Sequence, residues 1–167
     1  MTWLTTILSA VALMFGGGQG GEPEAIRIEP PKPGARYGSV QIPRLRLNAP
    51  ISAGARLREL AASVGHLEST YWPGMGGTVA LFAHRVTPTL GLPHGPFRYI
   101  DRLRPGHRIV VTMPYGRYVY RVTGHRVVHR KAWKAFRAEL GEERLLIAAC
   151  HPPGSAAQRY VVIAERA

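Results

Sequence analysis

Apolar and polar positions alternate along the chain over short stretches that are separated by turns, a pattern typical of β-strands. Residues 39–51 (SVQIPRLRLNAPI) alternate around a proline, as an edge strand or a bent pair of strands does. Residues 78–84 (TVALFAH) form an apolar run after the glycine-rich turn WPGMGG. We expect this second run to be a buried strand that ends in a histidine.

A hairpin is predicted in the second half of the chain. Residues 107–113 (HRIVVTM) and 117–129 (RYVYRVTGHRVVH) lie on either side of the short turn sequence PYG. Because side chains alternate between the two faces of a strand, Tyr118, Tyr120 and Val122 are expected to share one face.

The remaining apolar runs complete a mostly β chain. RLLIAAC and RYVVIAE near the C-terminus predict two more strands. Only residues 55–63 (ARLRELAAS) and 132–140 (AWKAFRAEL) have helical spacing, both are short, and no internal repeat is present. We therefore predict an all-β fold, a closed β-barrel of about eight strands with one or two short helices.

The N-terminal segment differs from the rest of the chain. Residues 1–15 are almost entirely apolar, and the thirteen residues from Trp3 to Phe15 would span about 20 Å as a helix, against roughly 30 Å for a bilayer core. This length predicts a signal peptide or a membrane anchor. The alternative is a buried or frayed helix, because no basic residue precedes the apolar run and no A-x-A cleavage site follows it. Residues 16–37, rich in glycine and proline, predict a tether, and residues 38–167 are expected to form the folded domain.

Composition limits the class of protein. With 167 residues and 46% hydrophobic content, the chain can form one domain with a substantial core. Lysine and arginine outnumber the acidic residues by 22 to 10, which gives a net charge of +12. Such a charge favours polyanionic surroundings, namely nucleic acid, anionic lipid or an acidic cell-wall polymer. No dense basic run or nucleic-acid module is present, so we expect no nucleic-acid partner.

The chemistry of the chain centres on its single cysteine, Cys150. One cysteine excludes an internal disulfide, and seven scattered histidines do not form a metal site, so neither metal nor cofactor is expected. A lone cysteine is often only a small buried apolar residue. Here His84 ends one predicted strand, Cys150 ends another and Arg159 begins the next. Strand ends can gather at one rim of a barrel, so we predict an active site with Cys150 as nucleophile.

Three short motifs around these residues carry a resemblance. AHR at residues 83–85, LIAAC at 146–150 and QRYVV at 158–162 resemble the histidine, cysteine and arginine motifs of the sortases, cysteine transpeptidases that attach proteins to Gram-positive cell walls or build pili. The resemblance covers residues 38–165. The sequences CHP and HGPFRYID, with the short spacing from cysteine to arginine, are most similar to class E sortases of actinobacterial type.

Two positions depart from the family pattern. Ala83 stands where the family usually has glycine, and Ala149 stands where a threonine usually precedes the cysteine. The first adds a methyl group near the histidine, and the second removes a hydroxyl near the nucleophile. Both changes concern the shape and efficiency of the site, and neither removes a catalytic side chain.

The resemblance implies a role for each residue. Cys150 is expected to attack the carbonyl of a threonine-like residue in a sorting signal of LAxTG or LPxTG type, and Arg159 to bind the substrate backbone or the developing oxyanion. His84 is expected to protonate the departing amine. An amine of the cell wall or of a pilin then resolves the thioester. The implied location is the extracytoplasmic face of the membrane, with residues 1–15 as the anchor.

Other polar residues are weaker candidates. His94 in a loop, His151 beside the nucleophile and Ala149 are candidate substrate-binding residues. Asp101 is the only aspartate of the chain, so a Cys-His-Asp triad could use no other. The resemblance implies no triad, and we expect Asp101 to serve in a turn or a salt bridge.

Alternative functions stay open at this point. The chain could be a non-catalytic basic wall-binding domain with a degenerate site, or another exported cysteine transpeptidase or peptidase. An L,D-transpeptidase would need the sequence HGC with an arginine almost adjacent, and papain-type peptidases place the cysteine before the histidine. Neither pattern matches this chain.

Overall fold

The computed structural model describes residues 31–57, 59–61, 63–86 and 94–167. The predicted anchor at residues 1–15 and most of the predicted tether lie outside these residues. Within the described ranges, no helix is long and apolar enough to cross a membrane.

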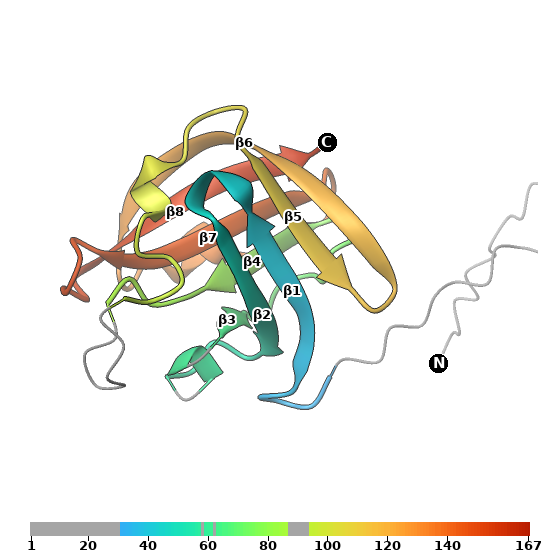
Figure 1. The fold of residues 1–167 in the computed structure, drawn as a ribbon, viewed down its shortest axis with the longest axis horizontal. Helices are drawn as coiled ribbons and strands as arrows, with labels where there is room; N and C mark the ends of the chain where they lie inside the picture. Colours follow the sequence, from blue (N-terminus) through green and yellow to red (C-terminus); the bar gives the residue numbers. More distant parts are fainter. Residues whose placement is uncertain (1–30, 58, 62, 87–93) are drawn as a thin grey trace, which may run out of the picture. The chain divides into compact units, whose positions relative to one another are not determined.

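Eight strands form a closed barrel in the order β1-β2-β3-β4-β7-β8-β6-β5 (Figure 1). The strands are β1 (Arg36–Ile42), β2 (Leu47–Ala53), β3 (Val64–His66), β4 (Thr78–Phe82), β5 (Arg108–Met113), β6 (Gly116–His129), β7 (Arg144–His151) and β8 (Gln158–Arg166). The pairs β2–β3 and β4–β7 are parallel, and the other neighbours are antiparallel. The predicted all-β barrel of about eight strands is therefore confirmed.

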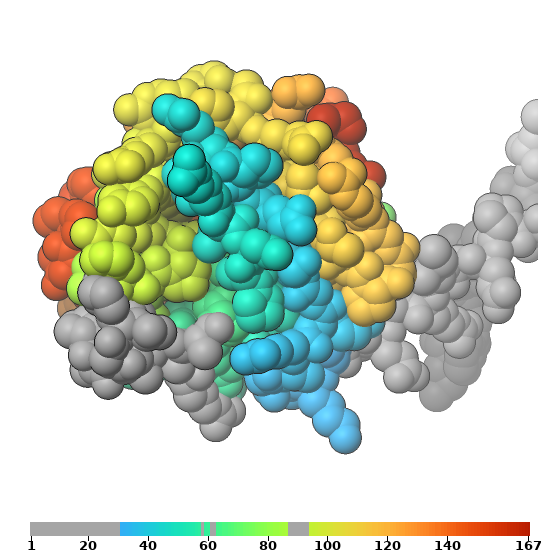
Figure 2. Space-filling model, viewed as in Figure 1, coloured from blue at the N-terminus to red at the C-terminus, as the bar shows by residue number. Residues whose placement is uncertain are grey.

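The run at residues 39–51 forms a bent pair of strands, not an edge strand. A 3-10 turn at Pro43–Leu45 joins β1 to β2, and Arg46 leaves it with a left-handed φ of 50°. Figure 2 shows β1 and β2, in blue to teal, crossing one face of the barrel with the β5–β6 hairpin beside them. Because the barrel is closed, neither strand has an unpaired edge.

The first strand starts earlier than the composition suggests. β1 begins at Arg36, inside the range 16–37 that was predicted as a tether. Gly34 donates its N–H to the carbonyl of Ala53 at 2.7 Å, and the ring of Tyr37 packs against Trp72 at 5.7 Å between centroids. These contacts add the last residues of the glycine and proline-rich segment to the barrel.

In their described residues, the two segments with helical spacing form 3-10 turns, at Glu59–Ala61 and Trp133–Phe136. In isolation, a helix of nine residues gains too few hydrogen bonds to offset its nucleation cost. Tertiary packing decides the conformation instead: Phe136 is buried against Phe82, with 4.9 Å between their ring centroids.

Two apolar clusters lie on opposite faces of β4 and β7. Leu145, Ile147 and Ala149 face the barrel interior, whereas Leu146 and Ala148 belong to an outer cluster. The outer cluster also contains Ala80, Phe82, Phe136 and Val161. Parallel strands in proteins are typically covered on both faces, and here loops provide the outer cover. The outer face of β4 and β7 is thus an apolar floor beneath loops.

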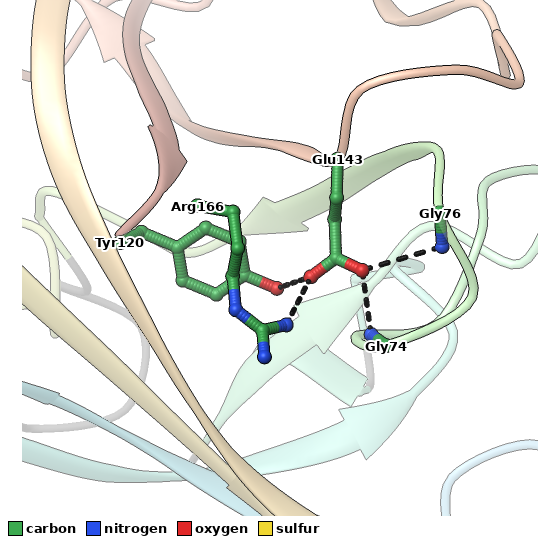
Figure 3. A network of polar contacts seen from close by, with 5 residues as sticks. All are labelled: Gly74, Gly76, Tyr120, Glu143 and Arg166. Carbon is green, nitrogen blue, oxygen red and sulfur yellow. Dashed lines mark hydrogen bonds and ion pairs between the residues drawn. The ribbon is translucent and has the colours of Figure 1, made fainter.

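A buried carboxylate joins three parts of the barrel (Figure 3). Glu143, whose side chain is 8% exposed, accepts hydrogen bonds from the hydroxyl of Tyr120 at 2.5 Å and from Nη1 of Arg166 at 3.0 Å. Its other oxygen accepts the N–H groups of Gly74 at 2.8 Å and Gly76 at 3.3 Å. Both glycines have positive φ, 91° and 66°, a conformation that other residues rarely adopt. Glu143 therefore connects β6, β8 and the turn before β4.

Replacing Glu143 by glutamine is expected to lower the free energy of unfolding by about 2–4 kcal/mol, measured by urea denaturation. The amide keeps the shape but loses the charge and turns an NH₂ group toward hydrogen-bond donors. Glu139→Gln is the matched control, because Glu139 is 56% exposed in its pair with Arg144 and should cost under about 1 kcal/mol. Equal stability of the two variants would contradict the prediction.

Candidate active site

A groove of about 740 Å³ lies on the outer face of β4 and β7. Phe82 and Ala148 form part of its floor. Its other described lining residues come from the neighbouring loops and strand ends: Ala55, Arg56, Leu57, Leu60, Leu67, Glu68, Ser69, Ala83, His84, Trp133, Ala149, Cys150, Ala156 and Arg159. The three residues that were predicted from the sequence to be catalytic thus share one groove.

Cys150 and Arg159 are register partners on the antiparallel strands β7 and β8. Directly opposite residues project to the same face, with their Cβ atoms about 5 Å apart. Cys150 follows Ala148 by two residues, so alternation places its side chain on the outer face as well. The thiol is partly exposed and unbridged. The site therefore lies on the outer wall near the strand ends, not around the mouth of the barrel.

His84 lies two residues beyond the end of β4. The N–H of Ala83 donates to the carbonyl of Ala148 at 3.2 Å, which extends the alignment of the two segments past the strand end. The N–H of Phe97 donates to the carbonyl of His84 at 3.0 Å. Partial burial lowers the pKa of His84 below its ordinary value of 6.5, because desolvation disfavours the charged ring.

The guanidinium of Arg159 is anchored to the loop between β7 and β8. Its Nη1 donates to the carbonyls of Ala156 and Gln158, both at 3.0 Å. The other guanidinium N–H groups make no hydrogen bond with the part of the chain that the structure describes. They are therefore available to a ligand in the groove.

The weaker candidates are placed differently. Ala149 lines the groove, although its side chain is 2% exposed and belongs to the interior cluster. His151 packs against Tyr160 at 5.7 Å between ring centroids, and His94 is exposed beside Arg98. Neither histidine is among the described residues that line the groove, so the geometry does not support their predicted role in substrate binding.

Asp101 lies in the 3-10 turn Ile100–Arg102 and forms a salt bridge, in agreement with the role expected from the sequence. Its Oδ2 lies 2.8 Å from Nη2 of Arg85, whose side chain is 3% exposed. Asp101 is not among the described residues that line the groove. The arrangement thus provides a cysteine, a histidine and an arginine without a triad aspartate.

Sequence reasoning missed the walls of the groove. Leu57 and Trp133 are 77% and 62% exposed, although both are large apolar residues. Both lie in segments whose spacing suggested helices. The available signal in the sequence was a tryptophan between two lysines, since a basic segment tends to stay at the surface and large apolar side chains left in solvent commonly mark binding sites.

Fold and groove together define a β-barrel protein with a thiol, an imidazole and a guanidinium on one outer wall. The sortase domain model matches residues 40–167. The chain belongs to the sortase family, whose members are cysteine transpeptidases.

Individual relatives agree with this assignment. The chain is 26% identical over 139 residues to sortase D of Bacillus subtilis (strain 168), covering 81% of this chain and 66% of the relative. Among solved structures, a sortase D5 transpeptidase of Clostridium perfringens has a TM-score of 0.71 and 25% identity, covering 81% of both chains. Sortase C1 of pilus island 1 from Group B Streptococcus has a TM-score of 0.71 and 30% identity, covering 79% of this chain and 64% of that one.

Proposed function

We propose that this domain cleaves a sorting signal after a threonine-like residue and transfers the acyl group to an amine. The observation that carries the proposal is the register pairing of Cys150 with Arg159 in the groove that His84 also lines. A non-catalytic wall-binding domain would have no need for these three side chains to share one groove.

In the first step, the thiolate of Cys150 attacks the scissile carbonyl carbon and forms a tetrahedral oxyanion. The free N–H groups of Arg159 stabilise this oxyanion. The C–N bond then breaks, and protonated His84 gives its proton to the departing amine. The product of this step is a thioester on Cys150.

In the second step, an amine attacks the thioester carbonyl and displaces the thiolate. Neutral His84 takes the proton from the attacking nitrogen, which restores the starting state. The lowered pKa of His84 favours the neutral ring needed for this step. Apolar walls at Leu57, Leu67 and Trp133 favour transfer over hydrolysis by limiting water around the thioester.

The substrate proposed is a surface protein or pilin with an LAxTG or LPxTG-like signal, and the acceptor is an amine of the cell wall or of a pilin. The motifs CHP and HGPFRYID support a class E specificity, whereas the relatives named above are class C and D enzymes. Incubation with a panel of such peptides and mass spectrometry should detect an acyl adduct on Cys150. Absence of an adduct with every peptide would refute the proposed function.

The pH profile of kcat/KM is expected to be a bell. Cys150 must be a thiolate and His84 an imidazolium, and the imidazolium is lost as the pH rises through the lowered pKa of His84. The loss of the imidazolium is therefore expected to be centred below pH 6.5.

The variant His84→Ala should lower the rate by about 10²-fold and lose the alkaline fall, because no imidazolium remains to titrate. Rates measured from pH 5 to pH 10 test this expectation. His94→Ala is the matched control and should keep the whole bell, since His94 lies outside the groove. An intact bell in His84→Ala would show that another group protonates the departing amine.

We also propose that residues 1–15 hold the enzyme at the extracytoplasmic face of the membrane, with the segment up to β1 as a tether. Removal of residues 1–30 should yield a domain that cleaves short peptides with unchanged kcat/KM but no longer sediments with membranes. The contacts of Gly34 and Tyr37 with the barrel are retained in this truncation. Loss of folding would show instead that the removed segment packs on the domain.

A further inference from the structure

The backbone of His84 is held from one side by the segment that begins at Gly95. Phe97 donates its N–H to the carbonyl of His84 at 3.0 Å, and Gly95 donates to the carbonyl of Arg85 at 3.1 Å. A Cβ atom on Gly95 would lie 2.0 Å from the carbonyl oxygen of His84 and 2.8 Å from its Cβ. The two segments are thus in direct contact, with no space between their backbones.

Arg85 adds a side-chain connection at the same place. Its Nη2 lies 2.8 Å from Oδ2 of Asp101, and its Nε donates to the carbonyl of Arg98 at 3.2 Å. The side chain of Arg85 is 3% exposed, and its Nη1 has no hydrogen-bond partner in the described part of the chain. A buried guanidinium is costly without an anionic partner, so Asp101 determines where the side chain of Arg85 can stay.

Asp101 is itself fixed to the barrel. It lies in the 3-10 turn Ile100–Arg102, and Ile100, Phe97 and Leu103 are all 0–1% exposed members of the interior cluster. The carboxylate is therefore carried by a turn that cannot shift without moving core side chains. Asp101, Arg85 and His84 form a continuous connection from the core to the groove.

We propose that Arg85 and Asp101 are positioning residues that hold the imidazole of His84 where it can reach the nitrogen of the leaving amine. The inference rests on the proposed function, in which His84 is the general acid. His84 and Arg85 share a peptide bond, so a displacement of the buried guanidinium is passed directly to the backbone of the catalytic histidine. A shift of about 1 Å is enough to reduce proton transfer strongly.

The same charges also lie near Tyr160, which follows Arg159. Burial is the main cause that raises the pKa of Tyr160, and the charges of Arg104, Asp101 and Arg85 act on it as well. A change at Asp101 could therefore reach Arg159 through β8. The experiment must separate an effect on the proton donor from an effect on the oxyanion.

Two substrates with different leaving groups separate these two effects. An amide substrate needs a proton on its departing nitrogen, whereas a thioester of the same peptide expels a stable thiolate and needs none. Both substrates form an oxyanion next to Arg159. For Asp101→Asn we expect kcat for the amide to fall about tenfold or more, with KM within twofold, and acylation by the thioester to stay within twofold.

Conservative and remote variants complete the test. Asp101→Glu restores a carboxylate and should recover amide cleavage to within about threefold of the wild type. Glu139→Gln, which removes a carboxylate from the exposed salt bridge with Arg144, should leave both substrates unaffected. If Asp101→Asn does not fold, Arg85→Met with Asp101→Asn removes both charges at once and should show the same selective loss.

The outcomes are distinct. Selective loss on the amide, with recovery in Asp101→Glu, supports the positioning role. Equal losses on amide and thioester, or no loss on either, would overturn it while leaving the proposed function in place. A wild-type enzyme that neither substrate acylates would overturn the proposed function, and the inference that rests on it.

Discussion

Cys150→Ala is expected to abolish acyl transfer, with a fall of roughly 10⁴-fold or more, because no other thiol exists in the chain to form the thioester. The fold should be unaffected. Cys150 is only partly buried and takes part in no disulfide, and alanine fills most of its volume. Peptide cleavage, adduct mass and the urea midpoint should be measured together. Cleavage by a folded Cys150→Ala protein would refute the assignment of the nucleophile.

Arg159→Lys is expected to lower kcat/KM by about 10³-fold, although the charge is retained. Lysine cannot keep the hydrogen bonds to Ala156 and Gln158 while it also donates into the groove, since it lacks the planar fork of arginine. Arg117→Lys on the exposed side of β6 is the matched control and should have wild-type rates. Near-normal rates in Arg159→Lys would show that charge alone suffices.

Most of the strands, β3 excepted, and the position of Cys150 and Arg159 at neighbouring strand ends followed from the sequence because their signals are local. Apolar runs bounded by glycine and proline located the strands, and the turn between residues 151 and 158 is short enough to require an antiparallel pair. In such a pair, Cys150 and Arg159 must lie opposite one another if the strands begin directly at the turn.

The outer position of the site could not be predicted in the same way. In LLIAAC every residue is apolar, because β7 is buried on both faces, so alternation gives no indication of which side is the interior. The walls formed by Leu57 and Trp133 come from segments whose conformation is decided by packing on the barrel. The Arg85–Asp101 pair depends on a contact between distant segments, which no local pattern reports.

The parallel pairing of β4 with β7 also determines when the site can exist during folding. The segments that carry His84 and Cys150 are separated in the sequence by the whole of β5 and β6, yet they lie side by side in the finished barrel. Contacts of such high sequence separation form late, after their loop-closure entropy has been offset by other contacts. We therefore expect the proposed acyl transfer to begin only when the barrel has closed, because an incompletely folded chain has the thiol without the imidazole or the groove beside it.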